Sequence, residues 1–351
     1  MKKVTVAING VGRIGRTLLR MMLDQPMIQV THINDVMPAE TFAHLLRYDT
    51  VHGALPRDIV VEGDGIVVDR RHIIFTRVPT PAEFSSKDLE VDVLVEASGR
   101  DMGREGLEYF FRAGAGRVIL ACPGETVADR TVVFGVNEGA VERADRILSN
   151  ASCTAHCVCP VLEVLEKSFG IESAFLNNVH PYTNSQNLVD SPHADLRRAR
   201  AASSNIIPTS TTAIDVACSI IPALQGRFAG ISTRVPVNAG ALAEMVLVLR
   251  KDVTPTEVNQ RIRNAAEGPM RGIIQYCTDP IVSSDIIGNR HSSILDSLMT
   301  KAVNGTTVQL LSWYDNECGF ASRIVDLVLY LGQLDEERHP TRTTSHSRSH
   351  V

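Results

Sequence analysis

The stretch Asn9-Gly10-Val11-Gly12-Arg13-Ile14-Gly15 decides the fold of the first part of the chain. It follows an apolar run, Val4–Ile8, that predicts a strand, and it leads into a segment, Gly12–Leu23, that predicts a helix. Its G-x-G-x-x-G spacing permits a tight turn, then a close approach of the backbone to a pyrophosphate, then close packing of helix on strand. The sequence therefore predicts a Rossmann-type unit that binds dinucleotide phosphates at the helix N-terminus.

An acidic residue farther along the chain refines the choice of cofactor. The apolar run Ile28–Ile33 predicts the second strand, and Asp35 follows it, 20 residues after Gly15. A carboxylate at this place accepts hydrogen bonds from ribose hydroxyls and repels a 2′-phosphate, so it favours NAD over NADP. The cofactor-binding residues expected from the motif are Gly10, Gly12, Arg13, Ile14, Gly15 and Asp35.

The rest of the pattern predicts a second domain. Val91–Glu96 and Arg117–Ala121 are further short apolar strands, which favour a mostly parallel sheet in the first domain. Ala243–Arg250 and Val308–Trp313 are longer and alternate, as expected of an α+β domain with an antiparallel or mixed sheet. The predicted fold class is therefore α/β, a Rossmann-type domain with a second α+β domain. We expect an NAD-binding domain at 1–151, a catalytic domain at 152–318, a C-terminal helix returning to the first domain at 319–334 and a disordered tail at 335–351.

Composition and charge disfavour several classes of protein. The 351 residues include 40 acidic and 35 basic side chains, and this net charge of -5 gives no support to nucleic-acid or membrane-surface binding. No apolar run reaches the roughly 18 residues of a membrane-spanning helix. The seven cysteines are odd in number and scattered, unlike a disulfide framework, so we expect a cytoplasmic protein.

A cysteine and a histidine are the candidate catalytic pair. In Asn150-Ala151-Ser152-Cys153-Thr154, Ser152 can cap a helix predicted from about Cys153 to Phe169. The positive end of a helix and a nearby imidazole both stabilise a thiolate. His180 follows 27 residues later, in His180-Pro181-Tyr182-Thr183. A thiol, an imidazole and a bound hydride acceptor are together what the oxidation of an aldehyde through a thioester requires.

Two other roles are open to cysteines in this segment. A cysteine in an apolar stretch can be an inert core residue, and Cys157, one helical turn after Cys153, fits that description. Cys153, His156, Cys157 and Cys159 are also metal-ligating residue types. They lie on one short helical stretch without the paired spacing of structural zinc sites, so we expect no metal.

Seven segments carry a resemblance to one known family. They are Asn9–Arg16, Leu46–Gly53, Asn150–Thr154, Asp195–Ala202, Asn205–Thr211, Arg234–Pro236 and Trp313–Glu317. Together they resemble the phosphorylating, NAD-dependent glyceraldehyde-3-phosphate dehydrogenases, and the resemblance runs from Val4 to about Leu331. It implies reversible oxidation of glyceraldehyde 3-phosphate to 1,3-bisphosphoglycerate, with inorganic phosphate as the second substrate.

The resemblance also implies a chemical role for each site residue. Cys153 would attack the aldehyde carbon, and His180 would accept the hydroxyl proton as hydride leaves for the cofactor. The Cys153 backbone N–H and His180 would hold the oxyanion. The residues implied for the substrate's own phosphate are Thr183 and Arg234, and those for the attacking phosphate are Ser152, Thr154, Thr211 and Thr212.

The remaining implications of the resemblance concern the cofactor and assembly. Asn316 would orient the nicotinamide, and Arg77 and Ser98 complete the implied cofactor set. The loop from about Ser185 to Asn205 is similar to one that lies at a subunit interface in the family. The resemblance therefore implies a homotetramer.

Several residues near the predicted site depart from the family's pattern. Ala155 and His156 replace a Thr and an Asn, and Thr212 replaces a Gly that lets the backbone approach phosphate. Further replacements are Ser185 for an Asp, Cys318 for a Trp and Phe320 for a Tyr. We expect His156 to lie at the surface or cap the helix, or else to alter the surroundings of the thiol. The departures indicate a divergent member, with two alternatives: oxidation of another phosphorylated aldehyde, such as erythrose 4-phosphate, or an NAD-binding paralogue without catalysis.

Overall fold

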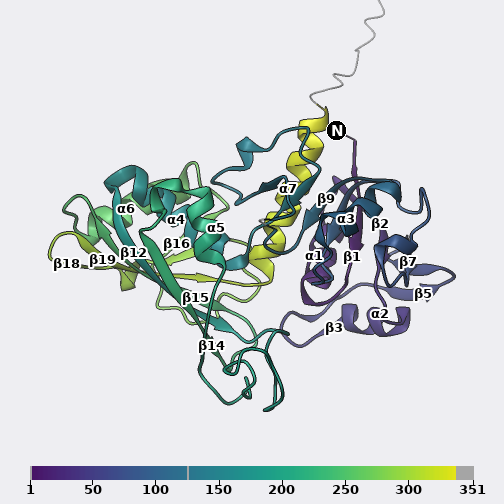
Figure 1. Cartoon of the computed structure of the whole chain (residues 1–351), viewed down its shortest axis with the longest axis horizontal. Helices are drawn as coiled ribbons and strands as arrows, with labels where there is room; N and C mark the ends of the chain where they lie inside the picture. Colours follow the sequence, from purple (N-terminus) through teal and green to yellow (C-terminus); the bar gives the residue numbers. More distant parts are fainter. Residues whose placement is uncertain (1, 125, 337–351) are drawn as a thin grey trace, which may run out of the picture.

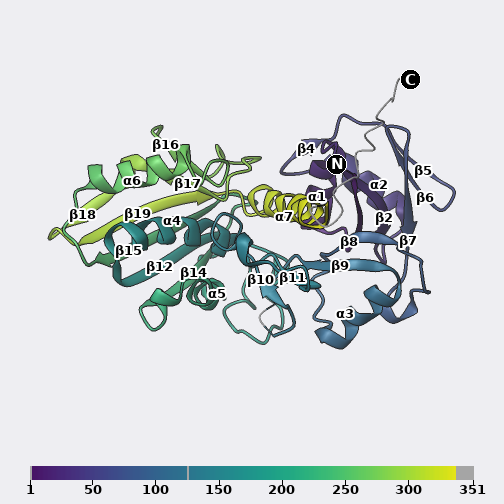
Figure 2. The same ribbon diagram turned by 90° about the horizontal axis from the view of Figure 1, so that it is seen from above.

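The computed structural model describes residues 2–124 and 126–336. The chain forms two lobes, each built around one large β-sheet (Figure 1). Seen from above, the C-terminal helix α7 (Cys318–Glu336) lies between the lobes (Figure 2). The predicted α/β fold class is thus confirmed.

The sheet of the first lobe is parallel except at one edge. The strands from β10 to β7 pair in parallel, and β6 and β5 extend the sheet in antiparallel pairing. In spatial order the strands are β10 (Arg130–Thr131), β11 (Ile147–Ser149), β9 (Ala115–Leu120), β8 (Val91–Glu96), β1 (Val4–Asn9), β2 (Ile28–Asn34), β7 (Arg71–Thr76), β6 (Gly65–Val68) and β5 (Ile59–Glu62). The strands predicted in this lobe are β1, β2, β8 and β9, with ends that differ by at most two residues.

The central strand β1 is buried on both faces. Val6 and Ile8 belong to a core shared with α1 (Arg13–Leu23) and α7, whereas Ala7 belongs to a core shared with α3 (Gly103–Arg112). Burial on both faces explains why β1 is a continuous apolar run rather than an alternating one. Its neighbours β2 and β8 lie on opposite sides of it, and ligands of such sheets bind at the carboxyl ends of strands where the order reverses.

The second lobe contains a mixed sheet covered by helices. The pairs β12–β14 and β16–β17 are parallel, and the other pairs are antiparallel. In spatial order the strands are β13 (Ile207–Thr209), β14 (Phe228–Val235), β12 (Ile171–Pro181), β15 (Ala241–Leu249), β19 (Thr307–Tyr314), β17 (Ser293–Asp296) and β16 (Ile274–Cys277), with β18 (Lys301–Val303) paired to β19. The helices that share a core with this sheet are α4 (Cys153–Phe169), α5 (Ala213–Ile220) and α6 (Pro255–Glu267). The predicted mixed sheet is therefore present.

Short elements complete the described chain. Helix α2 (Ala39–Arg47) packs in the core of the first lobe. The strands β3 (Tyr48–Asp49) and β4 (Gly53–Ala54) form a small antiparallel pair of their own. Single 3₁₀ turns lie at Pro81–Glu83, Glu138–Ala140, Pro222–Leu224 and Ser297–Met299.

Helix α7 is longer at both ends than the sequence predicts. Asp315 caps its start, because the carboxylate Oδ1 accepts the N–H groups of Glu317 (2.8 Å) and Cys318 (2.9 Å). Near its end, Asp335 forms an ion pair with Arg117 (2.6 Å). The expectation that a disordered tail begins at residue 335 is therefore wrong for residues 335 and 336, which are helical. The rest of that tail, 337–351, lies outside the described residues.

Two further findings concern the class of protein. All seven cysteines are free thiols. None of the helices within residues 2–124 and 126–336 combines the length and apolar character that a membrane crossing requires.

Candidate active site

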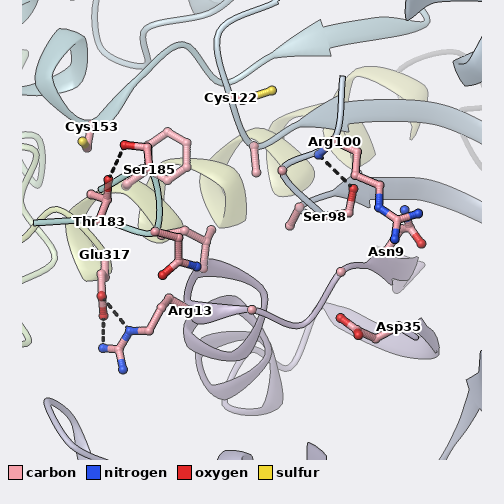
Figure 3. Close-up of a pocket in the computed structure, with 18 of the residues that line it drawn as sticks. Asn9, Arg13, Asp35, Ser98, Arg100, Cys122, Cys153, Thr183, Ser185 and Glu317 are labelled. Carbon is pink, nitrogen blue, oxygen red and sulfur yellow. Dashed lines mark hydrogen bonds and ion pairs between the residues drawn. The ribbon is translucent and has the colours of Figure 1, made fainter. Parts of the chain in front are cut away.

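A cavity of about 1200 Å³ opens at the carboxyl ends of β1, β2 and β8. Its lining includes Asn9, Asp35 and Ser98 from these strand ends, and Cys153 and His180 from the second lobe. Figure 3 shows Cys153 at left and Asp35 at right, with the start of α1 between them. The predicted cofactor turn and the predicted catalytic pair therefore line one continuous cavity.

The three glycines of the turn occupy different surroundings. Gly10 has a φ of +90°, and a Cβ built on it would lie 2.3 Å from the Cα of Ser98. A Cβ on Gly15 would lie 2.1 Å from the carbonyl oxygen of Gly10. Gly12 faces open space and lines the cavity. Side chains are thus excluded at two positions by packing, and the third leaves a bare stretch of backbone for a ligand.

The carboxylate of Asp35 is fixed against the turn. Its Oδ2 accepts the N–H of Val11 (2.8 Å), and its Oδ1 accepts the N–H of Met37 (3.0 Å). Arg77 is nearby in sequence to the end of β7, but it does not line the cavity and donates to the carbonyl of Val36 (3.0 Å) instead. Asp35 therefore faces the cavity from a fixed position. The Arg77 side chain contacts only the backbone of Val36, a residue that lines the cavity.

The other predicted cofactor residues lie around the same cavity. Arg13, Ile14, Ser98 and Asn316 all line it, whereas Gly15 lies behind the turn. The N–H of Ser98 donates to Glu96, a buried carboxylate at the end of β8 (2.8 Å). The Oδ1 of Asn316 accepts the N–H of Gly240 (3.2 Å), which fixes the side-chain amide at the junction of β19 and α7.

The thiol of Cys153 lies at the start of α4. The hydroxyl of Ser152 caps this helix by accepting the N–H of Ala155 (3.1 Å), and the helix runs from Cys153 to Phe169 as predicted. The Sγ of Cys153 lies 3.5 Å from the Nε2 of His180, which is near the end of β12. Cys157 is fully buried, and burial raises the pKa of its thiol to about 12, which agrees with the inert role expected for it.

The imidazole of His180 is neutral over the physiological range. Burial, together with the positive charge of Arg234, lowers its pKa to about 3. Nδ1 lies between the carbonyl of Pro181 (2.8 Å), which can only accept, and the Nη1 of Arg234 (2.5 Å), which can only donate. The tautomer with its proton on Nδ1, directed at Pro181, is the one that leaves a lone pair on the Nε2 that faces Cys153. Burial also raises the pKa of the Cys153 thiol above its ordinary value, and Arg234 opposes this only in part. Thiol and imidazole are therefore both uncharged at rest, whereas the sequence favours a resting thiolate.

The predicted phosphate-binding residues are only partly brought together. Thr183 lines the cavity, and its hydroxyl lies 2.9 Å from that of Ser185 (Figure 3). Arg234 pairs with His180 in the parallel register of β14 and β12 and donates to the carbonyl of Pro181 (3.0 Å). It thus lies behind His180 rather than in the cavity lining.

The residues expected for the attacking phosphate lie in different surroundings. Ser152 lines the cavity. The hydroxyl of Thr154 is buried and takes part in hydrogen bonds with Tyr314 (2.9 Å) and Asn178 (3.1 Å). Thr211 accepts the N–H of Ala213 at the start of α5, and Thr212 precedes that helix. Neither of these two threonines lines the cavity.

Comparison with known proteins gives the family. Residues 4–103 match the glyceraldehyde 3-phosphate dehydrogenase NAD binding domain, and residues 152–316 match the C-terminal domain of the same family. The glyceraldehyde-3-phosphate dehydrogenase of Geobacillus stearothermophilus is 42% identical over 329 residues, which are 93% of this chain and 98% of that protein. The chain belongs to the glyceraldehyde-3-phosphate dehydrogenase family.

Two more relatives also match over nearly their whole length. Glyceraldehyde-3-phosphate dehydrogenase 2 of Bacillus subtilis is 41% identical over 97% of this chain and 99% of its own length. Glyceraldehyde-3-phosphate dehydrogenase of Kitasatospora aureofaciens is 44% identical over 93% of this chain and 98% of its own length. The predicted family membership and the predicted NAD cofactor are thereby confirmed by the two domain matches, at residues 4–103 and 152–316, and by the relatives.

His156, which departs from the glyceraldehyde-3-phosphate dehydrogenase pattern, does not lie where the sequence predicts. His156 is neither at the surface nor a helix cap, because it is 1% exposed and its Nε2 donates to the carbonyl of Asn150 (2.9 Å). The ring of Phe320, another departure, contacts it edge to face with 6.1 Å between ring centroids. The two replacements in this family member therefore pack against each other.

The structure contains a network of charged side chains beside the glycine turn that the sequence analysis does not predict. Arg13 forms ion pairs with Glu317 (2.6 Å) and Asp49 (3.0 Å), and the Nε2 of His52 contacts Glu317 (2.7 Å). Figure 3 shows the Arg13–Glu317 pair at the wall of the cavity. Two segments already quoted for the family resemblance, Leu46–Gly53 and Trp313–Glu317, contain these partners, and that is the signal that could have found them.

Part of this network has the residue types of a metal site. His52, Asp315 and Cys318 place possible ligand atoms within 4.8 Å of one another. The Asp315 carboxylate, however, accepts N–H groups of Gly288, Glu317 and Cys318, and His52 is paired with Glu317. Helix capping and ion pairing therefore account for this cluster.

Proposed function

We propose that the chain catalyses the reversible, phosphorylating oxidation of glyceraldehyde 3-phosphate to 1,3-bisphosphoglycerate with NAD. The observation that carries this proposal is the 3.5 Å contact between the Cys153 thiol and the His180 imidazole, in the wall of the cavity that begins at the glycine turn. Relatives that are 41–44% identical over nearly their whole length are named glyceraldehyde-3-phosphate dehydrogenases, which supports the choice of substrate.

Two features of the cavity wall support NAD as the cofactor: the open space at Gly12 and the fixed carboxylate of Asp35. The bare backbone at Gly12 leaves room for a pyrophosphate, and Asp35 is fixed where it can accept hydrogen bonds from ribose hydroxyls. When bound, NAD supplies the acceptor for the hydride of the substrate. The residues proposed to hold it are Gly10, Gly12, Arg13, Ile14, Gly15, Asp35, Arg77, Ser98 and Asn316, with Arg77 acting from the rim.

In the proposed reaction, His180 would accept and return the protons of the Cys153 thiol and of the thiohemiacetal hydroxyl. Since thiol and imidazole are both neutral at rest, the thiol proton moves to Nε2 as Sγ attacks the aldehyde carbon. The backbone N–H of Cys153 lies in the first turn of α4, where N–H groups have no partner within the helix, and it can donate to the oxygen of the resulting thiohemiacetal. Nε2 returns this proton to the new oxygen, which gives the thiohemiacetal hydroxyl, and takes it back as the carbon loses its hydride and the thioester forms. Phosphate attack on the thioester then displaces the Cys153 sulfur, which regains the proton from Nε2.

We assign the two phosphate groups to two sets of residues. Thr183 would bind the phosphate of the aldehyde from the cavity wall, and Arg234 would contribute its positive charge from behind His180. The residues proposed for the attacking phosphate are Ser152, Thr154, Thr211 and Thr212. Because the Thr154 hydroxyl is occupied by Tyr314 and Asn178, we propose that Thr154 acts through its backbone N–H at the helix start.

The test of the proposed function is formation of NADH by the purified protein from glyceraldehyde 3-phosphate and NAD, with and without inorganic phosphate. We expect continuous turnover only when phosphate is present. A single stoichiometric burst with phosphate present would contradict phosphate as the acyl acceptor. Absence of any NADH would contradict the proposed substrate, and erythrose 4-phosphate would be the next aldehyde to measure.

Replacing Asp35 by alanine should relax the preference for NAD. The substitution removes a carboxylate that accepts ribose hydrogen bonds, and charge-assisted bonds of this kind contribute about 1.5–3 kcal/mol each. We therefore expect the ratio of kcat/KM for NAD to that for NADP to fall at least about tenfold. Steady-state kinetics with both cofactors measures this ratio. An unchanged ratio would mean that Asp35 does not contact the ribose.

Assembly and location also belong to this proposal. We propose a homotetramer, and the loop expected at its interface carries exposed apolar side chains, including Leu188, Val189 and Leu196, the last 82% exposed. We propose a cytoplasmic location, which the seven free thiols favour. Light scattering of the purified protein measures the assembly, and a monomer would contradict it.

A further inference from the structure

The backbone directly before the nucleophile adopts an unfavourable conformation. Ala151 has a φ of +53°, in the left-handed region that residues with a side chain rarely adopt. It immediately precedes Ser152, the cap of α4, and lies two residues before Cys153. Such conformations persist only where the surrounding structure fixes them, and they are common at functional sites.

Hydrogen bonds from three elements hold this turn. The N–H of Ala151 donates to the hydroxyl of Ser149 (3.1 Å), at the end of β11. The N–H of Asn150 donates to the carbonyl of Leu120 (3.0 Å), at the end of β9. The carbonyl of Asn150 accepts a hydrogen bond from the Nε2 of His156 (2.9 Å), the fourth residue of α4. His156 thus ties the helix back to the peptide that precedes it.

The same asparagine also connects the turn to helix α7. Its side-chain Nδ2 donates to the carbonyl of Phe320 (3.3 Å), and the Phe320 ring packs against His156. Asn150 and His156 are each 1% exposed, so water does not compete for these bonds. The turn is therefore held between α4 and α7 by a buried group of three residues.

The chemistry of the His156 ring limits what it can do here. Burial lowers its pKa to about 3, with a smaller effect of Arg323, so the ring is neutral. A carbonyl oxygen can only accept, so the proton of the ring is on Nε2. Nδ1 has no hydrogen-bond partner among the described residues. His156 therefore acts on its surroundings through one donated hydrogen bond and through packing, and not through charge.

We propose that His156 is a positioning residue for the nucleophile. Its Nε2–H holds the Asn150–Ala151 peptide in the left-handed turn, and this turn sets the Sγ of Cys153 against the Nε2 of His180. His156 itself does not touch the substrate. The inference rests on the proposed roles of Cys153 and His180, and displacements of about 1 Å between reacting groups can cost roughly 100-fold in rate.

Two substitutions of similar length separate the hydrogen bond from the packing. In His156→Gln, the side-chain amide nitrogen can replace Nε2 as donor, and in His156→Met no donor remains. The measurement is the rate at which iodoacetamide alkylates Cys153, followed by mass spectrometry of the Cys153 peptide, because Cys122 is an exposed thiol in the same cavity. Steady-state kinetics and NAD binding are measured on the same proteins.

We expect alkylation of Cys153 in His156→Met to slow roughly tenfold to 100-fold near neutral pH. The loss should be smaller in alkaline solution, because a thiol that ionises by itself no longer needs His180. We expect kcat to fall by a similar factor while KM for NAD stays within about twofold, and His156→Gln to recover most of the rate. A loss that is equal at every pH would indicate a general structural role and would overturn the proposal.

Two further results would also overturn it: alkylation in His156→Met at the wild-type rate, or equal impairment of the Gln and Met variants. If His156→Met does not fold, as judged by circular dichroism and NAD binding, His156→Phe is measured in its place, since phenylalanine fills the ring volume without a donor. The alkylation assay needs no turnover. A wild-type protein without dehydrogenase activity would therefore contradict the proposed function and still leave the inference testable.

Discussion

Replacing Cys153 by serine is expected to lower kcat for glyceraldehyde 3-phosphate oxidation roughly 10⁴-fold or more. The serine hydroxyl would take the place of Sγ near His180, but an alcohol is a much weaker nucleophile than a thiol and a poorer leaving group from the acyl intermediate. The measurement is NADH formation with saturating NAD and phosphate. Substantial remaining turnover would contradict the thioester mechanism.

The matched control for this variant is Cys157→Ser. Cys157 is on the same helix, one turn deeper, fully buried and in contact with Ser293 and Ser312. We expect Cys157→Ser to keep most of the activity and to lose some thermal stability, because a hydroxyl is less favourable in that core than a thiol. NAD affinity should be unchanged in Cys153→Ser, which would show that the loss is chemical and not a failure to bind the cofactor.

Replacing His180 by glutamine is expected to lower kcat about 10²–10⁴-fold, the range that general acid–base groups contribute. The amide nitrogen can still donate to an oxyanion, but the side chain can no longer take a proton from the thiol or the thiohemiacetal. The residual rate should therefore rise with pH, because a growing fraction of Cys153 ionises without a base. A kcat close to that of the wild type would remove His180 from the mechanism.

The wild-type pH profile provides a second test of the same residue. Since burial and Arg234 lower the pKa of His180 to about 3, the ring is neutral at pH 7 and stays so as the pH falls to 5. Protonation of His180 in the free protein should therefore cause no loss of kcat/KM in this window. A loss with an apparent pKa near 6.5, abolished in His180→Gln, would mean that the ring is more solvated than the structure shows.

The parts of the fold that could be predicted depend on local pattern. The glycine turn, β1 and α1 follow one another within 23 residues, and their apolar periodicity and glycine spacing are sufficient to locate them. The sequence predicts α7 at 319–334, within two residues of its ends at Cys318 and Glu336. The residues that it misses depend on contacts outside the apolar pattern, namely the Asp315 cap at the start and the Arg117–Asp335 ion pair near the end.

The candidate site shows the same limit more sharply. The sequence predicts that Cys153 and His180 act together, because a thiol nucleophile needs a base and both follow a dinucleotide-binding turn in the chain. The burial of His156 could not be predicted, since it depends on Phe320, which is 164 residues away in the sequence, and on the packing of α4 against α7. A polar residue on a first helical turn is more often exposed, and that general preference led to the wrong expectation.

The route of α7 has a consequence for how such a protein can be divided or recombined. The helix follows the last long strand of the second lobe, yet its apolar side chains complete the core around β1 and α1 in the first. A fragment that ends near Ala151 would leave that core open to water, and a fragment that begins near Ser152 would carry an apolar helix without its partner. The two lobes therefore cannot be exchanged independently between proteins at a single position in the chain. A chimera whose first lobe and α7 come from the same parent protein should be soluble. A chimera with a single crossover near residue 151 takes its first lobe from one parent and its α7 from the other, so the apolar surfaces of two different proteins have to fit each other.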